Sequence, residues 1–156
     1  MEFIDAANQR VTLKFCAQHD KATGNHVLAL PIYRKQLLMT NHCVRGIEFP
    51  GGKCEGDESS LDALRRELYE ETGATIEAAY YIAQYTVHAD PLPFTKDVYA
   101  VIVDKIVEKT NYLETNGPVL VSTLEDVPDE QKSTLLLDEA ILTCVERIST
   151  LGFYQL

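Results

Sequence analysis

The sequence predicts an α/β fold in which a mixed β-sheet is covered by helices on both faces. Apolar runs rich in β-branched residues occur before, between and after two segments of helical periodicity, the order expected when helices pack on a sheet. One run, residues 98–107, is almost continuously apolar, as in a central strand covered on both faces. The chain has 156 residues and a 46% hydrophobic composition. We therefore expect one domain spanning residues 1–156.

Short apolar runs bounded by turn-forming residues predict the strands. In chain order they cover residues 11–15, 26–33, 36–40, 80–87 and 98–107. A shorter strand is expected at residues 119–122, because the preceding Asn116-Gly117-Pro118 has the composition of a turn.

Two segments have the apolar periodicity of helices. The first covers residues 60–72, where Ser59 can cap the start, Asp62 completes a capping box, and Gly73 supplies a left-handed stop. The second covers residues 138–151 and is followed by Gly152.

Composition and charge narrow the classes of function. The formal net charge is −10, and an acidic surface repels a phosphate backbone, so we expect no stable binding to nucleic acid. No apolar run approaches the ~20 residues of a membrane span. The acidic start of the chain also lacks the features of a signal peptide. We expect a cytoplasmic protein with no membrane partner, either a monomer or a homodimer.

Three glutamates share one face of the first predicted helix. Glu67, Glu70 and Glu71 stand at i, i+3 and i+4, a spacing that places their carboxylates together. Like charges at these spacings repel by roughly 0.2–0.5 kcal/mol per pair, a cost that a solvated surface tolerates. The cluster alone therefore fits either an exposed acidic face or a cation site.

The loop before this helix favours the cation site. Gly51-Gly52 lets main-chain atoms approach a ligand closely, and Glu58 adds a carboxylate just before the helix. Carboxylate and carbonyl oxygens are the ligands that Mg²⁺ requires. Loop and helix together predict a magnesium site, which Mn²⁺ could also occupy.

Residues 52–74 resemble the Nudix box, GX5EX7REUXEEXGU, in which U is a bulky aliphatic residue. The matching positions are Gly52, Glu58, Arg66, Glu67, Leu68, Glu70, Glu71 and Gly73. Ala74, at the final position, is smaller than the pattern asks. The resemblance implies the α-β-α sandwich of the Nudix hydrolases.

The resemblance also implies a set of ligands for divalent metals. They are the carbonyl of Gly52 and the carboxylates of Glu67, Glu70 and Glu71. Glu114, on a downstream loop, is the acid that we expect to add a further ligand. Asp90 and Asp97 are weaker alternatives for that position, and an ordinary surface role for Glu114 stays open.

Catalytic and supporting roles follow from the same resemblance. Glu67 by analogy takes a proton from the attacking water, and Glu70 is a second carboxylate on which turnover depends. Arg66 resembles the orienting arginine of the family and is expected to pair with Glu58, since a bidentate guanidinium holds a carboxylate in one geometry. Gly73 supports the end of the helix.

The flanks of the box suggest a subfamily. The run Glu48-Phe49-Pro50-Gly51-Gly52-Lys53 is similar to the corresponding segment of MutT-like enzymes, and the wider pattern resembles YtkD-type nucleoside triphosphatases. By that match Phe49 contacts the base and Lys53 the phosphates. The alternatives are a core aromatic for Phe49 and a solvated loop lysine for Lys53.

The function implied is Mg²⁺-dependent hydrolysis of nucleoside triphosphates to nucleoside monophosphate and pyrophosphate. 8-Oxo-dGTP is one candidate substrate, which would place the protein in nucleotide pool sanitation. RNA 5′-triphosphate ends and ADP-ribose are alternative substrates, and a non-catalytic nucleotide-binding module is an alternative class. The base preferred, the general base and the number of metals are not encoded in any motif of the chain.

Overall fold

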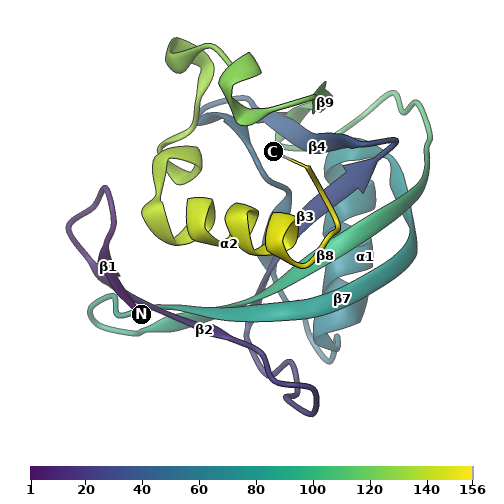
Figure 1. The fold of residues 1–156 in the computed structure, drawn as a ribbon. Coiled ribbons are helices and arrows are strands. Elements are labelled where there is room, and N and C mark those ends of the chain that lie inside the picture. Colours follow the sequence, from purple (N-terminus) through teal and green to yellow (C-terminus); the bar gives the residue numbers. More distant parts are fainter. Residues whose placement is uncertain (156) are drawn as a thin grey trace.

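A curved, nine-stranded sheet forms the centre of the computed structural model, which describes residues 1–155 (Figure 1). Leu156, the last residue of the expected domain, lies outside the described residues. The strands are β1 (Glu2–Ile4), β2 (Arg10–Phe15), β3 (His26–Tyr33), β4 (Gln36–His42), β5 (Gly46–Glu48), β6 (Gly51–Lys53), β7 (Ala74–Val87), β8 (Phe94–Ile106) and β9 (Thr115–Val121).

The sheet is mixed, as the sequence predicts. Its order is β1-β2-β7-β8-β3-β4-β5, with β6 paired to β3 and β9 paired to β4. Strands β3 and β8 are parallel, and the other paired strands are antiparallel. Val98 and Val101 of β8 are 0% exposed, which confirms the central, doubly covered strand.

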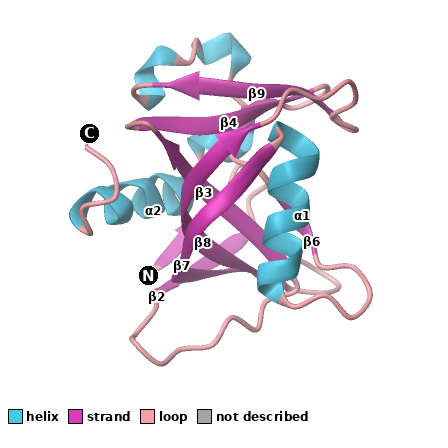
Figure 2. Cartoon of the chain, turned by 90° about the vertical axis from the view of Figure 1, so that its right-hand side faces the viewer, coloured by secondary structure: helices cyan, strands magenta, loops and turns pink. Residues whose placement is uncertain are grey.

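Helices α1 (Ser60–Thr72) and α2 (Glu139–Thr150) cover opposite faces of the sheet (Figure 2). Helix α1 buries Leu64 and Leu68 in one apolar cluster, and α2 buries Ile141 and Ile148 in the other. This confirms the predicted helices on both faces. Among residues 1–155, no helix is long and apolar enough to cross a membrane.

The ends of α1 are set by the local signals that the sequence shows. The Ser59 side chain accepts a hydrogen bond from Asp62 N, the Asp62 side chain accepts one from Ser59 N, and Gly73 adopts φ 77°. The predicted bounds of this helix are confirmed. The second helix is shorter by one residue at each end than predicted, because Asp138 is its N-cap and Leu151 its C-cap.

Strand extents depart most from the prediction. β7 begins directly after the helix at Ala74, six residues before the predicted start at residue 80. The expected turn at Asn116-Gly117-Pro118 lies inside β9. β9 pairs with β4 alone and contains an irregularity in register, and an edge strand of this kind accommodates a proline that has no N–H to donate.

Further short elements were not predicted. They are β1, β5 and β6, together with the 3₁₀ helices η1 (Leu124–Asp126), η2 (Asp129–Gln131) and η3 (Thr134–Leu137). Each spans three or four residues. Segments this short carry no periodicity from which they could be read.

Replacing Gly73 by alanine should destabilise the protein more than the same change at Gly152. Both glycines have positive φ, 77° and 87°, but a Cβ at Gly73 would lie 2.0 Å from Val107 O, whereas Gly152 has no neighbour within 4 Å. The left-handed backbone costs roughly 1–2 kcal/mol in each variant, and the clash adds roughly 1–3 kcal/mol at Gly73 alone. Urea denaturation measures both losses, and equal losses would contradict the steric explanation.

Candidate active site

The glutamates of α1 face a cleft beside the helix. A cavity of about 460 Å³ is lined by Gly52, Glu67 and Glu71, and a second of about 380 Å³ by Glu67, Glu70 and Glu71. Glu114 lines both cavities. The structure therefore brings together all five residues that the sequence suggested as metal ligands, from β6, α1 and the loop before β9.

Gly52 is required by a close approach to α1. Strand β6 pairs with β3 through Val27↔Gly52, which holds the glycine beside the helix. A Cβ at this position would lie 2.4 Å from Glu67 Oε1. Only glycine lets the Glu67 carboxylate lie against this backbone.

Arg66 ties the loop to the acidic face of α1. Its guanidinium donates to both carboxylate oxygens of Glu58, from Nε at 2.7 Å and from Nη2 at 2.9 Å. Nη1 donates to Glu67 Oε1 at 2.9 Å and to Glu70 Oε2 at 3.2 Å. The hydrogen bond from Arg66 lowers the pKa of Glu58 to about 2. The expected pair of Arg66 with Glu58 is thus present, with a bidentate geometry.

The surroundings of Glu67 and Glu71 disfavour the negatively charged form of both side chains. Burial, reinforced by the negative charge of Glu67, raises the pKa of Glu71 to about 8. Burial also raises the pKa of Glu67, which the hydrogen bond from Arg66 partly offsets. Carboxylates in such surroundings are neutralised either by a proton or by a cation.

The donor set fits a hard divalent cation. Carboxylate oxygens of α1 and the main chain of Gly52 share one cavity, and Mg²⁺ prefers oxygen ligands of this kind. In the part of the chain that the structure describes, no three His, Cys, Asp or Glu side chains already converge as a closed ligand set. Arg66 holds Glu67 and Glu70, so a metal would compete with this guanidinium for both carboxylates.

A second group of side chains forms an aromatic and basic wall of the first cavity. His26 and Phe94 stack with ring centroids 4.6 Å apart. The Nζ of Lys96 lies 5.3 Å from the Tyr85 ring centroid and 5.9 Å from that of Phe94. Burial lowers the pKa of both His26 and Lys96. This wall suits a flat ring and negatively charged groups.

Phe49 and Lys53 both line this cavity. Phe49 is 5% exposed and belongs to the apolar core. It is therefore a core aromatic that also forms part of the cavity wall. Lys53 is exposed at the end of β6, where its backbone pairs with that of His26. Their substrate roles stay predictions.

Arg45 and Glu48 are cavity residues that the sequence did not single out. Arg45 Nη2 donates to Glu48 Oε1 at 2.7 Å, and Ser133 Oγ donates to Glu48 Oε2, also at 2.7 Å. Both Arg45 and Glu48 line the first cavity. Their only signal in the sequence is position, since Glu48 begins the Glu48–Lys53 run and Arg45 comes three residues before it. Ser133, which bonds Glu48, lies far along the chain.

Asp97 is not placed to bind a metal in this cleft. It is 0% exposed, and its Oδ2 accepts hydrogen bonds from Gly24 N at 2.8 Å and from Ser60 Oγ at 2.7 Å. Asp90 lies in the exposed connection between β7 and β8, and neither aspartate lines the two cavities. Neither aspartate lies at the acidic face of α1, because Asp97 is bonded to the start of the helix and Asp90 lies in the connection between β7 and β8.

Known proteins resemble this chain over most of its length. Residues 22–132 match the family model of the NUDIX domain. YtkD of Bacillus subtilis (strain 168), whose name is "Putative 8-oxo-dGTP diphosphatase", is 34% identical over 142 residues, or 90% of each protein. The crystal structure of a mutant of the Bacillus subtilis pyrophosphohydrolase BsRppH is similar at a TM-score of 0.90 and 29% identity, over 99% of both chains. A NUDIX hydrolase from Nitrosomonas europaea, at a TM-score of 0.60 and 19% identity over 85% of this chain and 93% of its own, shares the fold.

Glu71→Gln should change how stability depends on pH in metal-free buffer. The pKa of Glu71 rises from 4.5 to about 8 on folding, so between these values the folded protein keeps a proton that the unfolded chain has lost. Wild-type stability therefore falls as pH rises through this window and is level above it. We expect the variant to be more stable at pH 8 by roughly 1–3 kcal/mol, since one pKa unit corresponds to about 1.4 kcal/mol.

Urea denaturation in EDTA from pH 4 to pH 8.5 measures this effect. Below pH 4.5 the two proteins should be equally stable, because Glu71 is then neutral in both states. Glu77→Gln removes one negative charge from an exposed position on β7 and serves as the control. A constant difference across the range would show that Glu71 does not titrate in this window.

Proposed function

This chain belongs to the NUDIX family of hydrolases, which act on acid anhydrides, and from that premise we propose that it is a Mg²⁺-dependent pyrophosphohydrolase. It converts nucleoside triphosphates to nucleoside monophosphate and pyrophosphate. The observation that carries the proposal is one cavity with acids on one wall and cationic and aromatic side chains on the other. A metal-bound polyphosphate with a planar base matches both walls.

The residues of the acidic wall have different roles in the proposed reaction. Mg²⁺, when bound, would neutralise phosphate oxygens and lower the pKa of a bound water. Glu67 and Glu71, with the Gly52 carbonyl, are the groups that would hold it in the first cavity. In this proposal Glu67 takes the proton of the attacking water, and its raised pKa suits a group that gains a proton during turnover. Arg66 orients Glu67 and Glu70.

The residues of the other wall position the substrate. Lys53 and Lys96 supply positive charge in a protein whose net charge is −10. The stacked rings of His26 and Phe94 offer a surface for a base. Similarity to YtkD supports 8-oxo-dGTP as a candidate substrate and nucleotide pool sanitation as the role. Such a role belongs in the cytoplasm, where nucleotides are abundant.

A second candidate substrate is the 5′-triphosphate end of an RNA. A further cavity of about 180 Å³ shares Phe94, Lys96 and Leu135 with the first cavity. The cleft therefore continues beyond the first cavity. The net acidity limits such binding to a short contact at the end of the strand.

Product analysis with purified protein and Mg²⁺ tests the proposal. The substrates are dGTP, 8-oxo-dGTP, the other nucleoside triphosphates, ADP-ribose and a short 5′-triphosphorylated RNA. We expect monophosphate and pyrophosphate from the triphosphates, because a cation held by the acidic wall would neutralise phosphate oxygens there. The order of kcat/KM ranks free nucleotides against RNA ends, and cleavage of ADP-ribose alone would reject the triphosphate proposal.

Glu70→Gln and Glu67→Gln should each lower kcat by roughly 10²–10⁴-fold while the protein stays folded, because a positioned carboxylate contributes about this much. The measurement is steady-state kinetics at saturating Mg²⁺ together with a thermal melt. Glu77→Gln, at an exposed position on β7, is the matched control and should keep wild-type turnover. Turnover that survives in both variants would remove these glutamates from the mechanism.

A further inference from the structure

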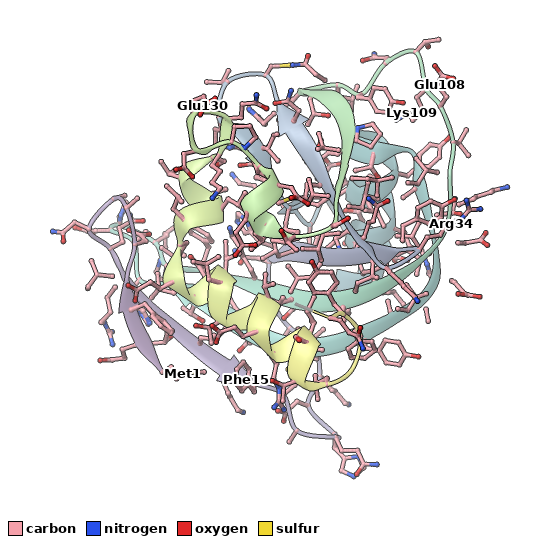
Figure 3. All side chains as sticks on the ribbon, turned by 45° about the horizontal axis from the view of Figure 1, so that its top comes forward. Met1, Phe15, Arg34, Glu108, Lys109 and Glu130 are labelled. Atoms are coloured by element: carbon pink, nitrogen blue, oxygen red, sulfur yellow. The ribbon has the colours of Figure 1, made fainter. Side chains whose placement is uncertain are left out.

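Lys109 binds the C-terminal end of the helix that carries the acidic face. Figure 3 labels it on the loop that follows β8. Its Nζ donates to the carbonyl oxygens of Tyr69 at 3.1 Å and Glu70 at 3.0 Å. The last turn of α1 contains no basic residue of its own. Lys109 is therefore the cation that this negative helix end receives from elsewhere in the chain.

The same lysine organises the loop on which it lies. Its Nζ is 4.8 Å from the ring centroid of Tyr69 and 5.5 Å from that of Tyr112, so the ammonium bridges a helix ring and a loop ring. The backbone N of Lys109 also donates to the Tyr112 hydroxyl at 2.9 Å. The loop is thus folded around Lys109 against the end of α1.

This loop ends at Glu114. Its carbonyl accepts a hydrogen bond from Cys43 N at 3.1 Å, and Thr115 Oγ1 donates to Glu71 O at 3.2 Å. The Glu114 side chain is exposed and, within residues 1–155, has no hydrogen bond or ion pair to orient it. Its position beside Glu67 and Glu71 therefore depends on where the backbone of the loop is held.

We propose that Lys109 is a positioning residue that holds Glu114 beside Glu67 and Glu71 and thereby sets the affinity of the site for divalent cations. The inference rests on the proposed metal-dependent function and on the expectation from the sequence that Glu114, which lines both cavities, adds a metal ligand. Lys109 lines neither of the two cavities at the acidic face, so it acts through the loop and does not touch the substrate.

A double-mutant cycle tests this role. Lys109→Met keeps the unbranched stem but removes the ammonium, and Glu114→Gln removes the carboxylate that it positions. Initial rates are measured against Mg²⁺ concentration for wild type, both single variants and the double variant. We expect Lys109→Met to raise the Mg²⁺ concentration for half-maximal rate about tenfold, as for other groups that orient metal ligands. At saturating Mg²⁺ its kcat should return close to the wild-type value.

The cycle separates positioning from a general loss of structure. In the Glu114→Gln background, Lys109→Met should change the Mg²⁺ requirement by no more than about twofold, because the group that it positions is already absent. Lys109→Arg should restore most of the wild-type behaviour. Lys105→Ala removes a positive charge from an exposed position at the end of β8 and is the matched control.

Several outcomes would overturn the proposal. The first is that the two substitutions have additive effects on the Mg²⁺ requirement. The second is that Lys109→Met leaves the Mg²⁺ requirement unchanged. The third is that Lys109→Met changes this requirement although Glu114→Gln does not. If wild-type protein hydrolyses no triphosphate, the proposed function fails. Two readouts that do not depend on activity still test the positioning role of Lys109. Lys109→Met should weaken Mn²⁺ binding in electron paramagnetic resonance titrations and speed amide exchange at Tyr112, Leu113 and Glu114. If either quantity is unchanged, the positioning role of Lys109 is rejected.

Discussion

The repulsion between carboxylates that share one cavity is the constraint on which the rest of this structure depends. Glu67 and Glu71 are one helical turn apart and both line the first cavity, where burial raises their pKa values. An isolated helix would relieve this repulsion by fraying at its end. Here Arg66 compensates part of the charge through Glu67 and Glu70. The remainder favours a divalent cation.

The fold meets the constraint by fixing both ends of α1. At the start, Ser60 Oγ donates to the buried Asp97 of β8 at 2.7 Å, next to the positive end of the helix dipole. At the other end, Lys109 donates to the last-turn carbonyls, and Thr40 Oγ1 donates to Glu71 O at 3.2 Å. These partners come from separate strands and loops, so the acidic face cannot move without disturbing the sheet.

The cavity joins opposite charges although the chain as a whole is acidic. The parallel pairing of β3 with β8 places His26 opposite Lys96, and the stacked ring of Phe94 completes this wall. The acidic wall comes from α1 and lines the same space. Carboxylates and cationic side chains therefore line one space. The net charge of −10 is consequently a poor guide to what this one cleft binds.

The sequence by itself determined the helix that carries the glutamate cluster, including its bounds, its capping box and the shared face of its glutamates. These features depend on residues within about one turn of each other, so local spacing is sufficient to predict them. Only the tertiary structure decided that the Asn116-Gly117-Pro118 run lies in an edge strand and that Asp97 is buried away from the cleft. It also placed Ser133 on Glu48, a contact between residues 85 positions apart. Burial and such distant contacts depend on how the strands pair, and strand pairing is a property of the whole chain that no local pattern records.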